Sequence, residues 1–387
     1  MRIALFSWET LHSIAVGGVG VHVTELAAAL ERRKHEVHVF TRQGPGQPTY
    51  DNIHGVHYHR CPFALHPTFV DEVNNMCRSF VDTFFSVEDF AGRFDIVHAH
   101  DWLAANAIVW IKEARGRRAV LTMHSTEYGR NGNRFHAGQS QRVQDHERHG
   151  TFCADRVITV SNQLREEIKW LYQLPDHKTK MVYNGVNAQT FDYDVDAGEV
   201  KHRYAIGPLD PTILFVGRMV VQKGPDILVR TMPSVLRYYP DAKFVFVGDG
   251  HMRHEVCATA HQLGVAHALR MLGDKRGREL HDLFKACDIV AVPSRNEPFG
   301  IVILEGWSAF KPVVSTKRGG PAEFVWHGVN GLQVDDTPES VSWGLGTLLA
   351  DHNQCRWMGR NGRAAVDAAF SWDNIAAQTE EVYSSIA

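Results

Sequence analysis

Two glutamates frame the segment EPFGIVILE, which follows the strand-like run DIVAVP. A helix that begins near Gly300 directs its free N–H groups and the positive end of its dipole toward the preceding turn, where they favour a phosphate group. Glu297 and Glu305 are separated by roughly 12 Å along such a helix axis, about the length of a diphosphate with a sugar ring at each end. Carboxylates repel phosphates but accept strong hydrogen bonds from sugar hydroxyls. The spacing therefore predicts a site for a sugar nucleotide.

Positive charge for such a site is supplied by the turn GRMVVQKG, which follows the strand-like run TILFV. Arg218 and Lys223 on this turn have the charge to hold a diphosphate and to stabilise it when its bond to the sugar breaks. The turn GGVG after the first strand is a second candidate, because Gly17 and Gly18 let backbone N–H groups approach an anion. GGVG fits tight helix packing equally well, and it differs from the GxGxxG fingerprint of dinucleotide-binding proteins.

These residues need a scaffold, and the chain alternates short strand-like runs with segments of helical periodicity. This alternation predicts an α/β fold with parallel sheets covered by helices on both faces. We predict two doubly wound Rossmann-like domains that face each other across a cleft, over residues 1–190 and 211–369, with a polar linker at residues 191–210. The predicted strands are RIALFSW, EVHVFTR, DIVHAH, AVLTMH, RVITVS, KMVYNGV, TILFVGRM, KFVFVGDG, ALRMLGD, DIVAVPS, PVVST and GLQVD.

Composition limits the class of protein. The 387 residues are 44% apolar and 22% charged, enough for two separate cores. The 41 basic and 44 acidic residues form no basic cluster, which argues against a nucleic-acid partner. Six cysteines without a CxxC pair, and no apolar span of membrane length, predict a cytoplasmic protein without a transmembrane segment. Peripheral contact with a membrane stays open. The 23 histidines show no metal-binding spacing, so no metal site is predicted.

The motifs GGVG, HAHDW, ADRVITVS, YNGVN, GRMVVQKG and EPFGIVILE occur along the chain in this order. With them, nearly the whole chain resembles the retaining GT-B glycosyltransferases of family 4 (glycosyl transferases group 1), and especially their glycogen- and starch-synthase-like members. The double match of GRxxxxKG and ExFGxxxxE is highly specific. In glycogen synthases a lysine usually precedes the two glycines, whereas Ala15 and Val16 precede them here.

The resemblance implies a role for each matching residue. It implies a group of catalytic residues that bind the donor diphosphate and the transferred sugar. These residues are Arg218, Lys223, Glu297 and His124. It implies that Glu305 holds the ribose. It implies further donor contacts from Gly17, Gly18, Phe299, Gly300, Ile301 and Val302. It places Asp101, from HAHDW, on the acceptor side, and it implies that the final helix, residues 370–387, crosses back onto the N-terminal domain.

The function expected from the residues and the resemblance is transfer of a hexose, with glucose from UDP-glucose or ADP-glucose as the preferred choice, to a carbohydrate such as an α-glucan. Retention of anomeric configuration is expected because the motifs offer neither a general base nor a nucleophilic carboxylate. No cofactor or metal is expected, since the DxD spacing of DYDVD falls in the linker.

Three other functions are compatible with parts of the same sequence. Transfer to a lipid-linked or small-metabolite acceptor is the first, because the polar segment HSTEYGRNGN suits a sugar but also an ordered loop without a ligand. A GT-B sugar-nucleotide epimerase is the second alternative. A non-catalytic, two-lobed sugar-binding protein is the third, and it comes from a different class.

Overall fold

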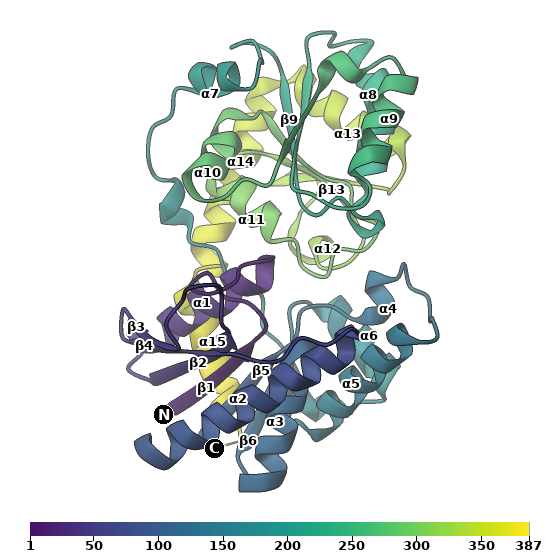
Figure 1. Cartoon of the computed structure of the whole chain (residues 1–387). Coiled ribbons are helices and arrows are strands. Elements are labelled where there is room, and N and C mark those ends of the chain that lie inside the picture. Colours follow the sequence, from purple (N-terminus) through teal and green to yellow (C-terminus); the bar gives the residue numbers. More distant parts are fainter. Residues whose placement is uncertain (387) are drawn as a thin grey trace. The chain divides into compact units, whose positions relative to one another are not determined.

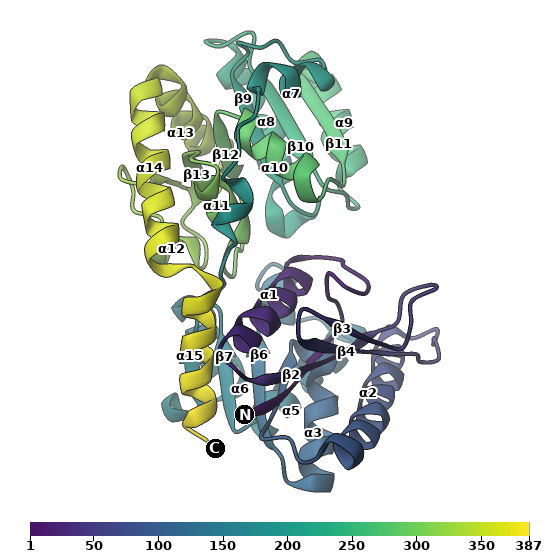
Figure 2. The same cartoon turned by 90° about the vertical axis from the view of Figure 1, so that its left-hand side faces the viewer.

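The computed structural model describes residues 1–386, which fold into two compact units. The N-terminal unit comprises Met1–Gly185 and the chain from Trp372 onward, and the C-terminal unit comprises Val186–Ser371. Each unit is a largely parallel sheet with helices on both faces (Figures 1 and 2). The predicted fold of two Rossmann-like domains is thereby confirmed. No described helix is long and apolar enough to cross a membrane.

The N-terminal unit contains a sheet with the strand order β3-β4-β2-β1-β5-β6-β7-β8. Neighbouring strands pair in parallel, except that β3 and β4 form an antiparallel hairpin at one edge. Strand β2 illustrates why such sheets form, since its sequence EVHVFTR is buried from Val37 to Thr41, as in strands covered on both faces. The strands are β1 (Arg2–Ser7), β2 (Glu36–Arg42), β3 (Tyr50–Ile53), β4 (Val56–Cys61), β5 (Ile96–His100), β6 (Arg118–Met123), β7 (Arg156–Thr159) and β8 (Thr179–Met181).

Helices from both ends of the chain cover this sheet. Helix α1 (Gly18–Arg32) buries Val23, Leu26 and Leu30 at helical spacing. The last helix, α15 (Trp372–Ser384), packs beside α1 (Figure 2). Thus residues distant in sequence contribute to one core. The remaining helices are α2 (Phe69–Ala91), α3 (Trp102–Arg115), α4 (Glu127–Arg130), α5 (Gln139–Cys153) and α6 (Asn162–Tyr172).

The C-terminal unit contains six parallel strands in the order β11-β10-β9-β12-β13-β14. This is the doubly wound order in which the connections reverse between β9 and β12, and ligands of such sheets bind at that reversal, outside the carboxyl ends of the strands. The strands are β9 (Thr212–Val216), β10 (Lys243–Val247), β11 (Leu269–Gly273), β12 (Ile289–Val292), β13 (Val313–Thr316) and β14 (Gly331–Val334).

Helices on both faces enclose the C-terminal sheet. Figure 1 shows α8, α9 and α13 on one side of it and α10, α11 and α14 on the other. The helices are α8 (Pro225–Leu236), α9 (Arg253–Gln262), α10 (Gly277–Ala286), α11 (Ile301–Ser308), α12 (Pro321–Phe324), α13 (Pro338–Ala350) and α14 (His352–Ala369).

The segment predicted as a linker, residues 191–210, is part of the C-terminal unit. It contains helix α7 (Ala197–Arg203) and follows a short 3-10 helix, Ala188–Phe191. Asp192 accepts hydrogen bonds of 2.7 and 3.0 Å from the Arg363 guanidinium. The Tyr193 hydroxyl donates to Asp282 at 2.9 Å. These contacts explain why the polar stretch is ordered.

Candidate active site

The two sequence motifs of the C-terminal unit meet at the reversal of its sheet. Strands β9 and β12 are hydrogen-bonded neighbours, and the loops after them carry GRMVVQKG and SRNEPFG. The Arg295 N–H donates to the Gln222 carbonyl oxygen at 2.8 Å, which joins the two loops directly. The predicted phosphate and sugar motifs therefore form one surface at the carboxyl ends of the strands.

Glycines let these loops approach one another more closely than any side chain would allow. Gly224 has a φ of 67°, and a Cβ there would lie 2.1 Å from the Pro293 carbonyl oxygen. Gly319, with a φ of 98°, faces the Glu297 carbonyl oxygen, which a Cβ would approach to 1.9 Å. Both glycines are required by a positive φ and by close backbone contact, so the loops hold a fixed shape.

Lys223 and Glu297 form an ion pair inside this surface. The Lys223 ammonium lies 2.9 and 2.7 Å from the two carboxylate oxygens of Glu297, and the Ser294 hydroxyl donates to the same carboxylate at 3.0 Å. The Glu297 side chain is 8% exposed, whereas that of Lys223 is 23% exposed. The pair satisfies a buried carboxylate and fixes the direction of both side chains. Sequence reasoning found the two residues but neither their pairing nor Ser294.

Arg218 and the start of helix α11 complete the positive side of this surface. The Arg218 side chain is exposed and has no hydrogen-bond or ion-pair partner among the described residues. Gly300 precedes α11 with a φ of 96°, and the first turn, from Ile301, leaves backbone N–H groups without helical partners. Phe299 is buried, with its ring packed against that of Phe324.

Glu305 lies one turn into α11 and is half-buried. Its carboxylate has no hydrogen-bond partner within residues 1–386, and burial raises its pKa to about 7. Removing a charged carboxylate from water without a hydrogen-bond partner costs free energy. Glu297 avoids this cost because it is paired with Lys223. This geometry suits an acceptor for hydroxyl groups of a ligand.

The glycine turn of the N-terminal unit is occupied by a carboxylate of the same chain. Glu9 accepts hydrogen bonds from the backbone N–H groups of Val16 at 2.5 Å and Gly17 at 2.6 Å. Gly17 caps α1, which begins at Gly18. Glu9 therefore fixes the turn, and the Gly17 N–H is already used. Sequence reasoning missed Glu9. Its negatively charged carboxylate accepts hydrogen bonds from the GGVG turn, where an anionic ligand was predicted to bind.

A cluster of histidines lies at the carboxyl ends of β5 and β6. The ring nitrogen Nδ1 of His100 lies 3.2 Å from Nε2 of His124. His22 on α1 packs against both, with ring centroids 5.1 and 4.5 Å away. Burial lowers the pKa of His124 to about 3 and holds that of His22 and His100 well below the usual value, with neighbouring imidazoles adding to the last two shifts. All three rings are neutral at physiological pH.

Asp101 supports His124 from the neighbouring loop. Its carboxylate accepts the His124 backbone N–H at 2.7 Å, and its own backbone has a φ of 57°. Burial raises the pKa of Asp101 to about 6, opposed by the charge of Arg130. A positive φ is a strained conformation for aspartate, and it persists only where the surroundings fix it. The hydrogen bond from the His124 N–H is one such contact, and through it Asp101 orients the loop that carries His124.

Most polar groups of the segment HSTEYGRNGN bind one another. The Arg130 guanidinium donates to Glu127, Glu147 and Ser125 at 2.9, 2.9 and 2.7 Å. Burial raises the pKa of Glu147 to about 7, against the charge of Arg130. The Tyr172 hydroxyl also donates to Glu147. Here the alternative of an ordered polar loop describes the segment well, and Glu147 and Tyr172 could not be connected to it from sequence.

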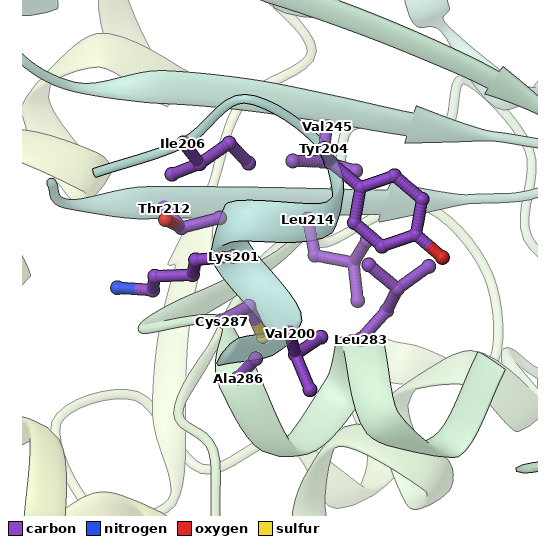
Figure 3. A pocket seen from close by; sticks show the side chains of 10 residues that line it. All are labelled: Val200, Lys201, Tyr204, Ile206, Thr212, Leu214, Val245, Leu283, Ala286 and Cys287. Carbon is purple, nitrogen blue, oxygen red and sulfur yellow. The ribbon is translucent and has the colours of Figure 1, made fainter. Parts of the chain in front are cut away.

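A small, mainly apolar pocket lies between α7, β9 and α10 (Figure 3). Its volume of about 10 Å³ leaves room for about one water molecule. Figure 3 shows Ile206, Leu214 and Leu283 among its lining side chains. It is too small for a nucleotide or a sugar.

Sequence comparisons agree with this arrangement. Residues 198–365 match the family model of glycosyl transferases group 1, and residues 16–190 match that of glycosyltransferase family 4. An uncharacterized glycosyltransferase of Methanocaldococcus jannaschii is 37% identical, covering 99% of this chain and 98% of that protein. A D-inositol 3-phosphate glycosyltransferase of Xylanimonas cellulosilytica is 32% identical over 95% and 91% of the two chains. A glycogen synthase of Mycobacterium tuberculosis is 29% identical over 99% and 94%.

Solved structures share the fold. Sucrose-phosphate synthase from Thermosynechococcus elongatus superposes with a TM-score of 0.85 at 23% identity, covering 99% of this chain and 98% of that one. Anabaena HepE in complex with UDP-glucose gives a TM-score of 0.79 at 20% identity over the whole of both chains. With the two family models and the full-length relatives, these likenesses show that the chain belongs to the group 1 glycosyltransferases and is a glycosyltransferase with the GT-B fold.

Proposed function

We propose that the C-terminal unit binds a nucleoside-diphosphate sugar and that the enzyme transfers its hexose to a carbohydrate acceptor. The observation that carries this proposal is the contrast between two carboxylates near one helix start. Glu297 is paired with Lys223, whereas Glu305 is half-buried without a partner among the described residues. A ribose that donates its hydroxyls to Glu305 would satisfy that carboxylate.

The diphosphate in this proposal lies between Arg218, Lys223 and the first turn of α11. An exposed guanidinium and a helix N-terminus favour a doubly charged anion. Glu297 would then turn toward the hydroxyls of the transferred sugar while it keeps Lys223 in place. Two further donor contacts are proposed from the N-terminal unit. One is the first turn of α1 at Gly18. The other is the neutral imidazole of His124, which would act as a hydrogen-bond partner and not as a charged acid.

Transfer is proposed to proceed with retention of the anomeric configuration. The bond between the anomeric carbon and the donor phosphate breaks, and the acceptor oxygen forms the new bond on the same face. The departing phosphate takes the acceptor proton while Arg218 and Lys223 stabilise its charge. The Asp101 carboxylate accepts a hydrogen bond from the His124 backbone N–H, which disfavours Asp101 as a general base.

Glucose is the proposed sugar, and an α-glucan is the first proposed acceptor. The relationship to a mycobacterial glycogen synthase and the fold shared with HepE in complex with UDP-glucose support this choice. A small phosphorylated metabolite is the second proposed acceptor, because a D-inositol 3-phosphate glycosyltransferase is 32% identical.

No catalytic metal is proposed, because Asp192 of the DYDVD segment is bound to Arg363 and the diphosphate already has two cations and a helix end. Treatment with a chelator should leave the transfer rate unchanged. Loss of activity with recovery in manganese or magnesium would contradict this part of the proposal.

The donor screen is the direct test of the function. Release of nucleoside diphosphate is measured from UDP-glucose, ADP-glucose, GDP-mannose and UDP-N-acetylglucosamine, each alone, with maltodextrin, and with inositol phosphate. We expect acceptor-dependent release from a glucose donor. Conversion of the donor sugar without any acceptor would instead indicate an epimerase, and binding without release would indicate a sugar-binding protein.

A further inference from the structure

Helices α8 and α13 pack against each other on the C-terminal unit (Figure 1). A groove lined by residues of both helices has a volume of about 450 Å³, within the range of about 300–1,000 Å³ that is typical of ligand sites. Tyr238, which follows α8, and Trp343 on α13 both line this α8–α13 groove and are 76% and 53% exposed. Large exposed aromatic side chains that gather in one concave place mark an interaction site.

Gly346 on α13 keeps the α8–α13 groove open. Its neighbour Gly344 is required by packing, because a Cβ there would lie 2.9 Å from side-chain atoms of Val314 and Val334. A Cβ on Gly346 would meet no atom within 4 Å, and Gly346 does not have a positive φ. Glycine destabilises a helix interior relative to alanine, and the packing of α13 does not require this one. The missing side chain instead leaves space in the groove for a ligand.

The polar side chains of the groove are uncharged hydroxyls. Those of Ser234 and Ser342 have no hydrogen-bond partner among the described residues. The Tyr239 hydroxyl lies 3.5 Å from the Gly346 carbonyl oxygen, too far for a strong hydrogen bond. None of the residues that line the groove is charged. Hydroxyls donate and accept hydrogen bonds and so suit a ligand rich in hydroxyls, whereas a lining without cations disfavours a phosphate or an anionic lipid surface.

We propose that the α8–α13 groove is a non-catalytic binding site for a neutral glycan chain, and that this chain is an α-glucan. The faces of a glucose ring carry C–H groups, which stack on the electron-rich face of an aromatic ring, and its edges carry hydroxyls. Trp343 and Tyr238 supply the aromatic faces, and the hydroxyls of the groove bind the edges. The groove selects a neutral sugar chain, and the choice of an α-glucan rests on the proposed acceptor.

The groove is separate from the proposed donor site of the same unit. Helix α8 begins at Pro225, two residues after Lys223, and its 12 residues extend about 18 Å toward the end that Tyr238 follows. A glucan chain held in the groove stays attached to the enzyme between transfers, which raises its effective concentration. The groove should therefore lower the KM for long acceptors without changing kcat or the use of short ones.

Glycan binding is tested on the full-length protein without a sugar-nucleotide donor. The affinity for maltodextrin is measured from migration in native gels that contain it, with polygalacturonate as an anionic comparison. We expect maltodextrin, and not polygalacturonate, to slow the parent protein. Trp343→Ala should weaken the affinity about tenfold. Gly346→Leu should weaken it as much, because the leucine side chain fills the groove, and should keep or raise the Tm, because leucine favours a helix.

Trp357→Ala is the matched control, because Trp357 lies on α14 of the same unit, is 50% exposed and does not line the groove. It should bind maltodextrin as the parent does. Unchanged affinity in both Trp343→Ala and Gly346→Leu would overturn the proposal, as would an equal loss in Trp357→Ala. Sedimentation of the parent as a dimer that Trp343→Ala dissociates would also overturn it, because a second copy of the chain would then cover the groove.

Transfer assays separate this proposal from the proposed function. With a glucose donor and maltotriose, Trp343→Ala should release nucleoside diphosphate at the parent rate, whereas its KM for long maltodextrin should rise. An unchanged KM for long maltodextrin would overturn the role of the groove and leave the proposed function intact. Groove-dependent binding of maltodextrin by an enzyme that transfers glucose only to another acceptor would support the groove and contradict the α-glucan acceptor.

Discussion

The strand ends of the two units use polar groups in opposite ways. In the C-terminal unit, charge is kept near the surface, with Arg218 exposed and Lys223 paired to Glu297. In the N-terminal unit, Glu9 accepts hydrogen bonds from the backbone of its own turn, and the imidazole of His124 is half-buried and neutral. Arg218 therefore remains available for an anionic ligand, as the proposed donor site requires, whereas Arg130 of the N-terminal unit is already paired with Glu127 and Glu147 of the same unit.

The largest effect is expected at the ion pair of the C-terminal unit. Lys223→Ala removes a cation from the proposed diphosphate site and leaves the buried Glu297 without its partner. Loss of one preorganised stabilising group typically costs about 10²–10³ in rate, or roughly 3–4 kcal/mol. Steady-state rates of nucleoside-diphosphate release would measure it.

Lys243→Ala is the control for Lys223→Ala, since Lys243 pairs with Asp210 and is the first residue of β10, at the opposite end of the strands from the two loops. It should keep the parent rate, because surface pairs contribute little. Comparable loss in both variants would show that the charge of Lys223 has no special role.

The next effect concerns the close contact of the two loops. Gly224→Ala forces a Cβ to within 2.1 Å of the Pro293 oxygen, whereas a Cβ on Gly264, where φ is 71°, would meet no atom within 4 Å. Both substitutions carry a strain of about 1–2 kcal/mol from the left-handed backbone, but only Gly224→Ala adds the clash. Urea unfolding should show the larger loss for Gly224→Ala. Equal losses would mean that the loops separate without cost.

A smaller effect is expected from Glu297→Gln. The amide keeps the size of the side chain and can still bind Ser294, but it loses the charge that attracts Lys223. We expect turnover to fall about ten- to a hundredfold, or roughly 1.4–2.7 kcal/mol, while nucleotide affinity changes less. A fall in affinity with unchanged turnover would place Glu297 with the nucleotide and not with the sugar.

The smallest expected effect is a pH dependence of nucleotide affinity that comes from the C-terminal unit and not from His124 of the N-terminal unit. Burial raises the pKa of Glu305 to about 7, so the charged acceptor form is lost as pH falls through 7. Nucleotide affinity should therefore decline by at most about tenfold per pH unit below that value, and Glu305→Gln should remove this dependence. The pKa of His124, lowered to about 3 by burial, predicts no contribution from that imidazole between pH 5 and 9. Isothermal titration calorimetry between pH 5 and 9 measures these nucleotide affinities. A pH dependence of the affinity that persists in Glu305→Gln would show that Glu305 is not its source.

Local patterns predicted the strands that lie inside the sheets but not the edge hairpin. Short runs rich in apolar and β-branched residues identified β2 and β9, because both faces of these strands are covered. Strand β4, with the sequence VHYHRC, looks polar, yet His59 and Arg60 are buried. Arg60 is tolerated there because its guanidinium donates to the carbonyl oxygens of His12 and Pro48. Those partners are set by the tertiary structure and leave no local signal.

The same limit applies to the sites. The motif spacing identified Lys223 and Glu297, because the charge types point to phosphate and sugar chemistry. Their pairing joins loops 74 residues apart and depends on which strands are neighbours. The convergence of His22 with His100 and His124 likewise depends on how α1 packs on its sheet, so histidine spacing alone did not predict this cluster.

Binding of the donor ribose by Glu305 is central to the proposed function, and a double-mutant cycle tests it most directly. Affinities of the nucleoside diphosphate and its 2′,3′-dideoxy analogue are measured by calorimetry for the parent and Glu305→Gln at pH 8. We predict that removing the ribose hydroxyls costs the parent about 1.5–3 kcal/mol, the usual range for hydrogen bonds to a charged group, and costs Glu305→Gln much less. The same loss in both proteins would show that Glu305 does not bind the ribose and would contradict the proposed donor site.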